Sequence, residues 1–165
     1  MDEKIEPPDS FHLLSAQGWL ELGDLDEARA ELRLVSSRFL EHPCVLEVRW
    51  QISAKERAWH DCVGLAAELA RAAPDSPVGW VHRSFALHEL KLTGEARDNL
   101  LVAAEMFPED PLICYNLACY ECQLGALEKA RTWLRTACQL GNSKHFKKLA
   151  RDDPDLQPLW EGGHP

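Results

Sequence analysis

The heptapeptides LGDLDEA (residues 22–28) and LGALEKA (residues 124–130) are separated by three intervals of 34 residues. Other residues recur at the same interval with no insertion. The recurring positions are Pro43, Pro77 and Pro111; Pro74 and Pro108; Leu25, Trp59, Thr93 and Leu127; Ala28, Cys62, Ala96 and Ala130; and Leu32, Ala66, Leu100 and Leu134. A fixed period of this length is typical of chains that stack copies of one supersecondary unit. The sequence therefore predicts four repeats, at residues 9–42, 43–76, 77–110 and 111–142.

Each recurring column suits a particular place in a pair of helices. The prolines at 43, 77 and 111 fit the first turn of a helix, where the missing N–H is not needed. Pro74 and Pro108 end the preceding helix, because proline cannot continue its hydrogen-bond ladder. Gly23 and Gly125 permit a tight turn with positive φ. The small residue in the 28, 62, 96 and 130 column lets two helices approach closely. Each repeat is thus predicted to be a helix, a turn and a second helix.

The composition favours helices as well. Leu and Ala account for 44 residues, whereas Val, Ile and Thr account for 13. Unbranched and small residues have high helix propensity, and β-branched residues are the ones that favour strands. The predicted fold class is all-α.

The period and the columns resemble those of the tetratricopeptide repeat family over residues 9–142. The resemblance implies a right-handed superhelix of four helix–turn–helix repeats that ends in a closing helix. Three positions depart from the family pattern. Trp50 stands where the family usually has Gly or Ala, and Arg57 and Lys91 stand at the turn where the first and fourth repeats have glycine.

The two ends of the chain are predicted to differ from the repeats. Residues 1–8 form an acidic extension without an apolar core and are expected to be mobile. Residues 143–165 are predicted to form a closing helix over 143–151, with Phe146, Leu149 and Ala150 on one face, and a tail. The tail is expected either to fold back as an apolar hook (Leu156, Leu159 and Trp160) or to be disordered. The acidic run Asp152, Asp153 and Asp155 is interpreted as a solvated turn, since it lacks the spacing of a calcium loop.

By the same resemblance, the first helices of the repeats line a concave groove that binds partners. Residues spaced i, i+4, i+7 and i+8 share one face of a helix. The predicted groove residues are Leu13, Gln17, Leu20 and Glu21; Glu47, Gln51 and Lys55; Val81, Phe85, His88 and Glu89; and Leu112, Tyr115, Cys119, Cys122 and Gln123. The first half is polar and the second half is apolar and aromatic, which is typical of an interaction surface. The alternative is that Phe85 and Tyr115 are core residues.

Three of the six cysteines lie within CYNLACYECQLG, residues 114–125. A zinc site needs about four ligands in a tetrahedral array, usually on turns rather than along one helix. Cysteine also packs well as a small apolar residue, and Cys62 and Cys138 stand in columns otherwise filled by small residues. We therefore interpret these cysteines as structural and predict no cofactor. Cys119, Cys122 and His88 remain a minority hypothesis for a metal site.

Charge and motifs exclude several classes of function. The chain has 27 acidic and 18 basic residues and a formal charge of −9, without the basic stripe of a nucleic-acid binder. No stretch predicts a membrane span or an export signal, so a cytoplasmic location is expected. No Walker loop, GxSxG, GxGxxG or HExxH motif is present, and the chain is not expected to be an enzyme.

The sequence therefore predicts a non-catalytic module that binds a peptide or helix segment of another protein in its groove. The alternatives are a secretion-type chaperone that holds an export substrate and a protein that depends on thiols or zinc. Some tetratricopeptide proteins grip a chaperone tail through Lys, Arg and Asn, but the corresponding positions here supply no such cations. Those positions hold Leu13, Gln17 and Val48, or Glu47, Gln51, His82, Leu112 and Asn116 one repeat later. The identity of the partner and the oligomeric state stay open.

Overall fold

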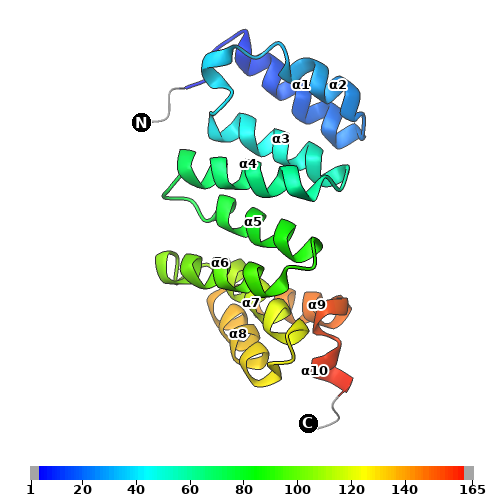
Figure 1. The fold of residues 1–165 in the computed structure, drawn as a ribbon, viewed down its shortest axis with the longest axis vertical. Coiled ribbons are helices and arrows are strands. Elements are labelled where there is room, and N and C mark those ends of the chain that lie inside the picture. The colour runs from blue at the N-terminus through cyan, green and yellow to red at the C-terminus, as the bar shows by residue number, and fades with distance from the viewer. Residues whose placement is uncertain (1–3, 162–165) are drawn as a thin grey trace. The chain divides into compact units, whose positions relative to one another are not determined.

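The computed structural model describes residues 4–161, which form helices and connections and include no strand. The all-α prediction is confirmed (Figure 1). The α-helices are α1 (Asp9–Leu22), α2 (Leu25–Leu32), α3 (Pro43–Lys55), α4 (Trp59–Ala72), α5 (Val78–Glu89), α6 (Thr93–Met106), α7 (Pro111–Gln123), α8 (Leu127–Leu140), α9 (Ser143–Asp152) and α10 (Pro158–Glu161). Two short 3₁₀ helices, η1 (Ser37–Phe39) and η2 (Pro154–Leu156), lie in connections. Each predicted repeat thus holds two helices.

The chain divides into two compact parts, an N-terminal part of residues 1–82 and a C-terminal part of residues 83–165. In the N-terminal part, the hairpin of α1 and α2 packs against α3, which pairs with α4 (Figure 1). Its core is one apolar cluster from α1, α2, α3 and the connection that contains η1. The cluster consists of Leu13, Ala16, Leu20, Ala28, Leu32, Val35, Phe39, Val45, Val48 and Ile52.

The predicted N-terminal extension is only partly covered by the structure. Residues 1–3 lie outside the described residues. Ile5, however, packs against the core cluster of the N-terminal part. The extension therefore contacts the repeats at this residue, where an apolar side chain gains by leaving water. The mobility of residues 1–8 stays a prediction.

Helix starts follow the proline column and short side-chain caps. Pro43 and Pro111 occupy the first turns of α3 and α7. Before α7, Asp110 Oδ1 accepts hydrogen bonds from the backbone N–H groups of Leu112 and Ile113, at 2.8 and 3.1 Å. These bonds satisfy donors that have no partner within the helix.

The turn inside each repeat has one residue in the left-handed region. These residues are Gly23 (φ 84°), Arg57 (φ 59°), Lys91 (φ 67°) and Gly125 (φ 79°), spaced at the 34-residue period. The second and third repeats therefore make the same turn as the first and fourth, although they lack the glycine. A left-handed conformation costs an ordinary L-residue roughly 1–2 kcal/mol, so the packing of the two helices must hold it in place.

We expect Lys91→Gly to raise the free energy of unfolding by about 0.5–1 kcal/mol. Glycine removes the strain of the positive φ, and this gain exceeds the conformational entropy that glycine adds to the unfolded chain. Arg135→Gly is the matched control, because Arg135 is an exposed residue inside α8 and glycine there should cost about 1 kcal/mol. Urea denaturation followed by circular dichroism measures both. A loss of stability in Lys91→Gly would contradict the left-handed turn.

The small column marks where the two helices of a repeat touch. Ala28, Cys62, Ala96 and Ala130 are fully buried. The backbone carbonyl of Ala96 accepts a hydrogen bond from the hydroxyl of Ser84 on the preceding helix, at 3.1 Å. A larger side chain in this column would push the helices apart.

Trp50 is accommodated although it replaces a small residue. Its ring is buried and stacks on the imidazole of His82, with 3.7 Å between ring centroids and 3° between the planes. His82 lies near the start of α5, so the large ring fills the space between α3 and the next first helix. The local departure from the family pattern therefore leaves the pairing of α3 with α4 intact.

The C-terminal part ends in a closing helix and a hook. Helix α9 packs against α8, η2 packs against α7, and α10 packs against α8. Phe146 and Ala150 of α9 are buried, whereas Leu149 is 39% exposed. Leu156 and Leu159 of the hook are also buried. The Trp160 indole N–H donates to the backbone carbonyl of Ala150, at 3.2 Å. Of the two alternatives for the tail, the structure shows the folded hook up to residue 161, and residues 162–165 lie outside the described residues.

None of the helices within residues 4–161 combines the length and the apolar character that crossing a membrane requires.

Candidate functional site

The first-helix face is the set of predicted groove residues on α1, α3, α5 and α7. In the N-terminal part it is polar. Gln17, Glu21 and Lys55 are exposed, and Glu47 and Gln51 are partly buried. Gln17, Glu21 and Lys55 therefore reach solvent, and the role of these five residues in a groove stays a prediction. Leu13 is not on the surface, because it is buried in the core cluster together with Leu20.

Glu47 is the centre of a small polar network on this face. Its two carboxylate oxygens lie 2.9 and 3.0 Å from Nε2 of His82, and Oε1 accepts a hydrogen bond from the Gln51 side chain at 2.8 Å. Burial raises the pKa of Glu47, but the bonds from His82 and Gln51 outweigh it and hold the pKa below its usual value. Glu47 is thus a fixed carboxylate at neutral pH. His82 is not among the predicted groove residues; the structure adds it to this network through its bonds to Glu47 and its stacking on Trp50.

The second half of the face begins with apolar side chains. Val81 is partly buried, Phe85 is 40% exposed, and Glu89 is partly buried. Phe85 is therefore a surface residue and not a core residue. Its ring is one of the larger apolar groups that α5 presents to solvent.

On α7 the predicted face is already covered by the hook. Tyr115, Cys119 and Cys122 are buried, whereas the sequence predicts them on an open groove. The Tyr115 hydroxyl donates to Asp153 Oδ2 at 2.7 Å, and Cys119 Sγ lies 3.6 Å from the same oxygen. Residues 153–159 of the same chain lie on the predicted face of α7. The 34-residue period could not reveal this cover because the hook lies outside the repeats.

The acidic run is likewise not a fully solvated turn. Asp152 is exposed, but Asp153 and Asp155 are partly buried. Nε2 of His88 lies 3.1 Å from Asp155 Oδ2, and the Gln123 side-chain amide donates to the backbone carbonyl of Asp155 at 2.9 Å. Both aspartates therefore face α5 and α7.

The thiols of the cysteine-rich helix are held in their protonated form. Burial, aided by Asp153, raises the pKa of Cys119, and burial also raises the pKa values of Cys114 and Cys122. Metal ligation requires the thiolate. His88, the third member of the minority metal hypothesis, bonds Asp155 through Nε2 and lies 3.0 Å from the Thr93 hydroxyl through Nδ1. Over residues 4–161, no three or more His, Cys, Asp or Glu side chains are arranged to hold a metal ion.

We expect one fast-reacting thiol in the native protein. Cys44 is exposed, Cys138 is partly exposed, and the other four cysteines are buried. Burial raises the pKa of Cys62 to about 11, so its reactive thiolate is scarce at neutral pH. Reaction with a chromogenic disulfide reagent at pH 8 should show one rapid phase that Cys44→Ser removes. Cys138 should react more slowly than Cys44, and the four buried thiols only in denaturant. Rapid reaction of Cys119 or Cys122 in the native protein would contradict their burial.

Comparison with known proteins identifies the fold. No family of known protein sequences and no curated protein matches the chain. Solved structures do match. The MamA RS-1 ArsTM double mutant superposes with a TM-score of 0.70 at 13% identity, over 85% of this chain and 79% of that one. MamA MSR-1 superposes with a TM-score of 0.66 at 19% identity, over 82% and 78%. The complex of the TPR2AB domain of yeast Sti1 with pHSP90 superposes with a TM-score of 0.62 at 16% identity, over 92% and 68%.

The fold is that of the tetratricopeptide repeat. The resemblance drawn from the 34-residue period is thus confirmed. Because the identities are low, the likeness concerns the fold, and the residues of any binding site must be argued from this chain alone.

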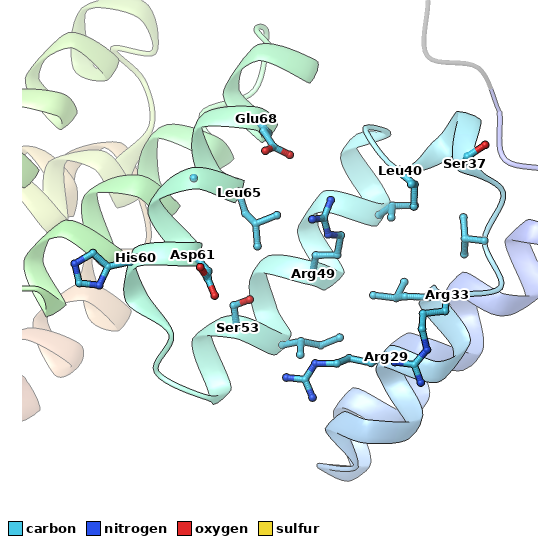
Figure 2. A pocket seen from close by; sticks show the side chains of 15 residues that line it. Arg29, Arg33, Ser37, Leu40, Arg49, Ser53, His60, Asp61, Leu65 and Glu68 are labelled. Carbon is cyan, nitrogen blue, oxygen red and sulfur yellow. The ribbon is translucent and has the colours of Figure 1, made fainter.

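A second surface of this tetratricopeptide fold is a cavity of about 940 Å³ in the N-terminal part (Figure 2). It opens where α2 stops after 8 residues, whereas α4 has 14. Figure 2 shows Arg29 and Arg33 on the α2 side, Asp61 and Glu68 on the α4 side, and Arg49 of α3 between them. Basic and acidic groups thus face each other, so the charge of the cavity selects no single class of ligand.

The connection that borders this cavity is tied to the start of α1. Asp9 Oδ1 accepts a hydrogen bond from the backbone N–H of Ser36 at 2.6 Å. That bond lowers the pKa of Asp9 and outweighs the opposing effect of burial, with a smaller contribution from Arg38. Asp9 is therefore a buried carboxylate that holds the connection after α2 to the start of α1. The repeat columns did not indicate this role.

Proposed function

We propose that the chain is a non-catalytic interaction module that holds a peptide segment of another protein against its first-helix face. The observation that carries this proposal is the position of residues 153–159 on α7. A short segment that is not part of any repeat lies on the predicted face, and its side chains and backbone are bonded by Tyr115, Gln123 and His88. The face is therefore suited to a peptide.

Two further features support the proposal. In the N-terminal part, the first-helix face carries exposed polar groups such as Gln17 and Glu21. In the C-terminal part, it carries an exposed aromatic ring, Phe85, with the carboxylate residue Glu89 one turn further along α5. Aromatic anchors surrounded by polar groups are the usual composition of a binding surface. In addition, one structure of the same fold is a complex of a tetratricopeptide domain with pHSP90.

Site-specific photocrosslinking tests the proposal without disturbing the fold. A photoreactive phenylalanine analogue is placed at Phe85 and at Lys55 on the first-helix face, and at Val102 as the control. Val102 is 48% exposed and belongs to α6, a second helix. After irradiation in a lysate of the source organism, we expect crosslinks to a partner peptide from positions 85 and 55 and few from 102. Equal crosslinking from position 102 would refute the assignment of the face.

A partner identified in this way allows an energetic test. Phe85→Ala should weaken its binding by about 1–3 kcal/mol, as expected for an aromatic anchor. Val102→Ala should leave the affinity unchanged, and both variants should melt close to the wild type.

A further inference from the structure

Residues 153–159 bind α5 and α7 of the C-terminal part through two carboxylates and one backbone carbonyl. Asp153 Oδ2 accepts from the Tyr115 hydroxyl at 2.7 Å, and Asp155 Oδ2 lies 3.1 Å from Nε2 of His88. The carbonyl of Asp155 accepts from the Gln123 amide at 2.9 Å. These contacts recognise two acidic side chains, Asp153 and Asp155, and the backbone carbonyl of Asp155 fixes the direction of the segment.

Apolar anchors complete the contact. Leu156 is fully buried and Leu159 is nearly so, with η2 on α7 and α10 on α8. Closing the end of a repeat stack requires only that such apolar groups be covered. The polar contacts to Asp153 and Asp155 go beyond that requirement, because burying a carboxylate is unfavourable unless specific donors meet it.

The segment is also shaped in advance for this contact. Asp153 Oδ1 accepts from the backbone N–H of Asp155 at 2.9 Å and so starts the η2 turn. Pro154 restricts the backbone of the same turn, and Pro158 begins α10. A segment that is rigid before it binds loses little conformational entropy on binding.

We propose that the face formed by His88, Tyr115, Cys119 and Gln123 is a binding site for an acidic segment of the type Asp-Pro-Asp-Leu, and that a partner protein with such a segment binds there by displacing residues 153–159. This inference rests on the proposed function and names the chemistry of the partner. The tethered segment competes at the high effective concentration of an intramolecular ligand. Partner binding is therefore weak until the segment is released.

The test uses the full chain and a labelled peptide, ARDDPDLQPLWE, that copies residues 150–161. Asp155→Asn weakens the tethered segment through one carboxylate, and the Asp153→Asn/Leu156→Ser double variant weakens it further. Both leave the receiving face unchanged. Fluorescence anisotropy should show peptide binding at least about ten-fold tighter to the double variant than to the wild type, with Asp155→Asn in between.

Control peptides and variants distinguish specific binding from non-specific binding. Two control peptides should bind at least about ten-fold more weakly. One is a scrambled peptide, and the other has the aspartates equivalent to Asp153 and Asp155 changed to asparagine. Adding Tyr115→Phe to the variant should also weaken binding of the original peptide, because the hydroxyl that donates to the aspartate equivalent to Asp153 is lost. Circular dichroism verifies that each variant is folded.

Hydrogen exchange of the wild type supplies a readout that needs no substitution. Excess peptide should accelerate exchange of the backbone amides at 155–161 and leave those of α8 unchanged. Failure of the peptide to bind any folded variant, together with unchanged exchange, would overturn the proposal. Crosslinks from Phe85 and Lys55 to an unrelated segment would then still support the proposed function. Exchange of the segment between two copies, seen as a dimer of the wild type in sedimentation, would overturn the assignment to a partner protein.

Discussion

Leu100→Ala is expected to lower the free energy of unfolding by about 2–5 kcal/mol. Leu100 is fully buried in α6, and the substitution removes its apolar contacts and leaves a cavity that the helices fill only in part. Urea denaturation followed by circular dichroism measures the loss. The effect would rank among the largest for a single substitution in this chain.

Leu134→Ala is the matched control for Leu100→Ala, since Leu134 occupies the same position in the fourth repeat. Its side chain is only partly buried, so we expect a smaller loss, of about 1 kcal/mol. Equal losses at the two positions would show that the place in the repeat, and not burial, determines the loss in free energy of unfolding. That result would contradict the packing described for α6.

Gly79→Ala is expected to cost about 2–3 kcal/mol. A Cβ at Gly79 would lie 2.4 Å from the backbone nitrogen of Ala70 and 2.9 Å from the carbonyl oxygen of Ala66, both on α4. Backbone atoms cannot rotate away as a side chain can, so α5 and α4 would have to separate along their contact. Thermal unfolding of the purified variant should show a clearly lowered midpoint.

Gly64→Ala distinguishes this close contact from a general effect of glycine. Gly64 lies inside α4, and a Cβ there would have no neighbour within 4 Å. Alanine should therefore raise stability by about 0.5–1 kcal/mol through its better helix propensity. A stable Gly79→Ala variant would mean that α4 and α5 are farther apart than the structure has them.

The repeats could be predicted from the sequence because each column has a local physical cause. Pro43 and Pro111 start helices, and Ala96 and its equivalents sit where two backbones approach, as the period indicates. The family resemblance also assigned the polar residues Gln17, Glu21 and Lys55 to an open face, and the structure has them exposed. These features depend on contacts within one repeat. Such contacts recur every 34 residues and are therefore visible in the sequence.

Other features depend on contacts that a period does not contain. The left-handed φ of Arg57 and Lys91 is imposed by the packing of the helices on either side, against the preference of those residues. The connection after α2 is tied to the start of α1 by the hydrogen bond from Ser36 to Asp9, 27 positions away. Tyr115 and Cys119 are covered by Asp153 and its neighbours, which follow the last repeat. Long-range polar contacts of this kind leave no regular spacing in the sequence.

Because the hook follows α7 in the sequence, the face of α7 is uncovered for part of the time during synthesis. Synthesis proceeds from the N-terminus, and domains begin to fold as they leave the ribosome. Helix α7 therefore emerges well before residues 153–159, and for that interval the side chains of Tyr115 and Cys119 have no cover. A ribosome-arrested chain that has released only the residues up to Asp152 should bind the peptide more tightly than the finished protein does. A partner translated nearby would have its best access during this interval, before the nascent chain supplies its own occupant.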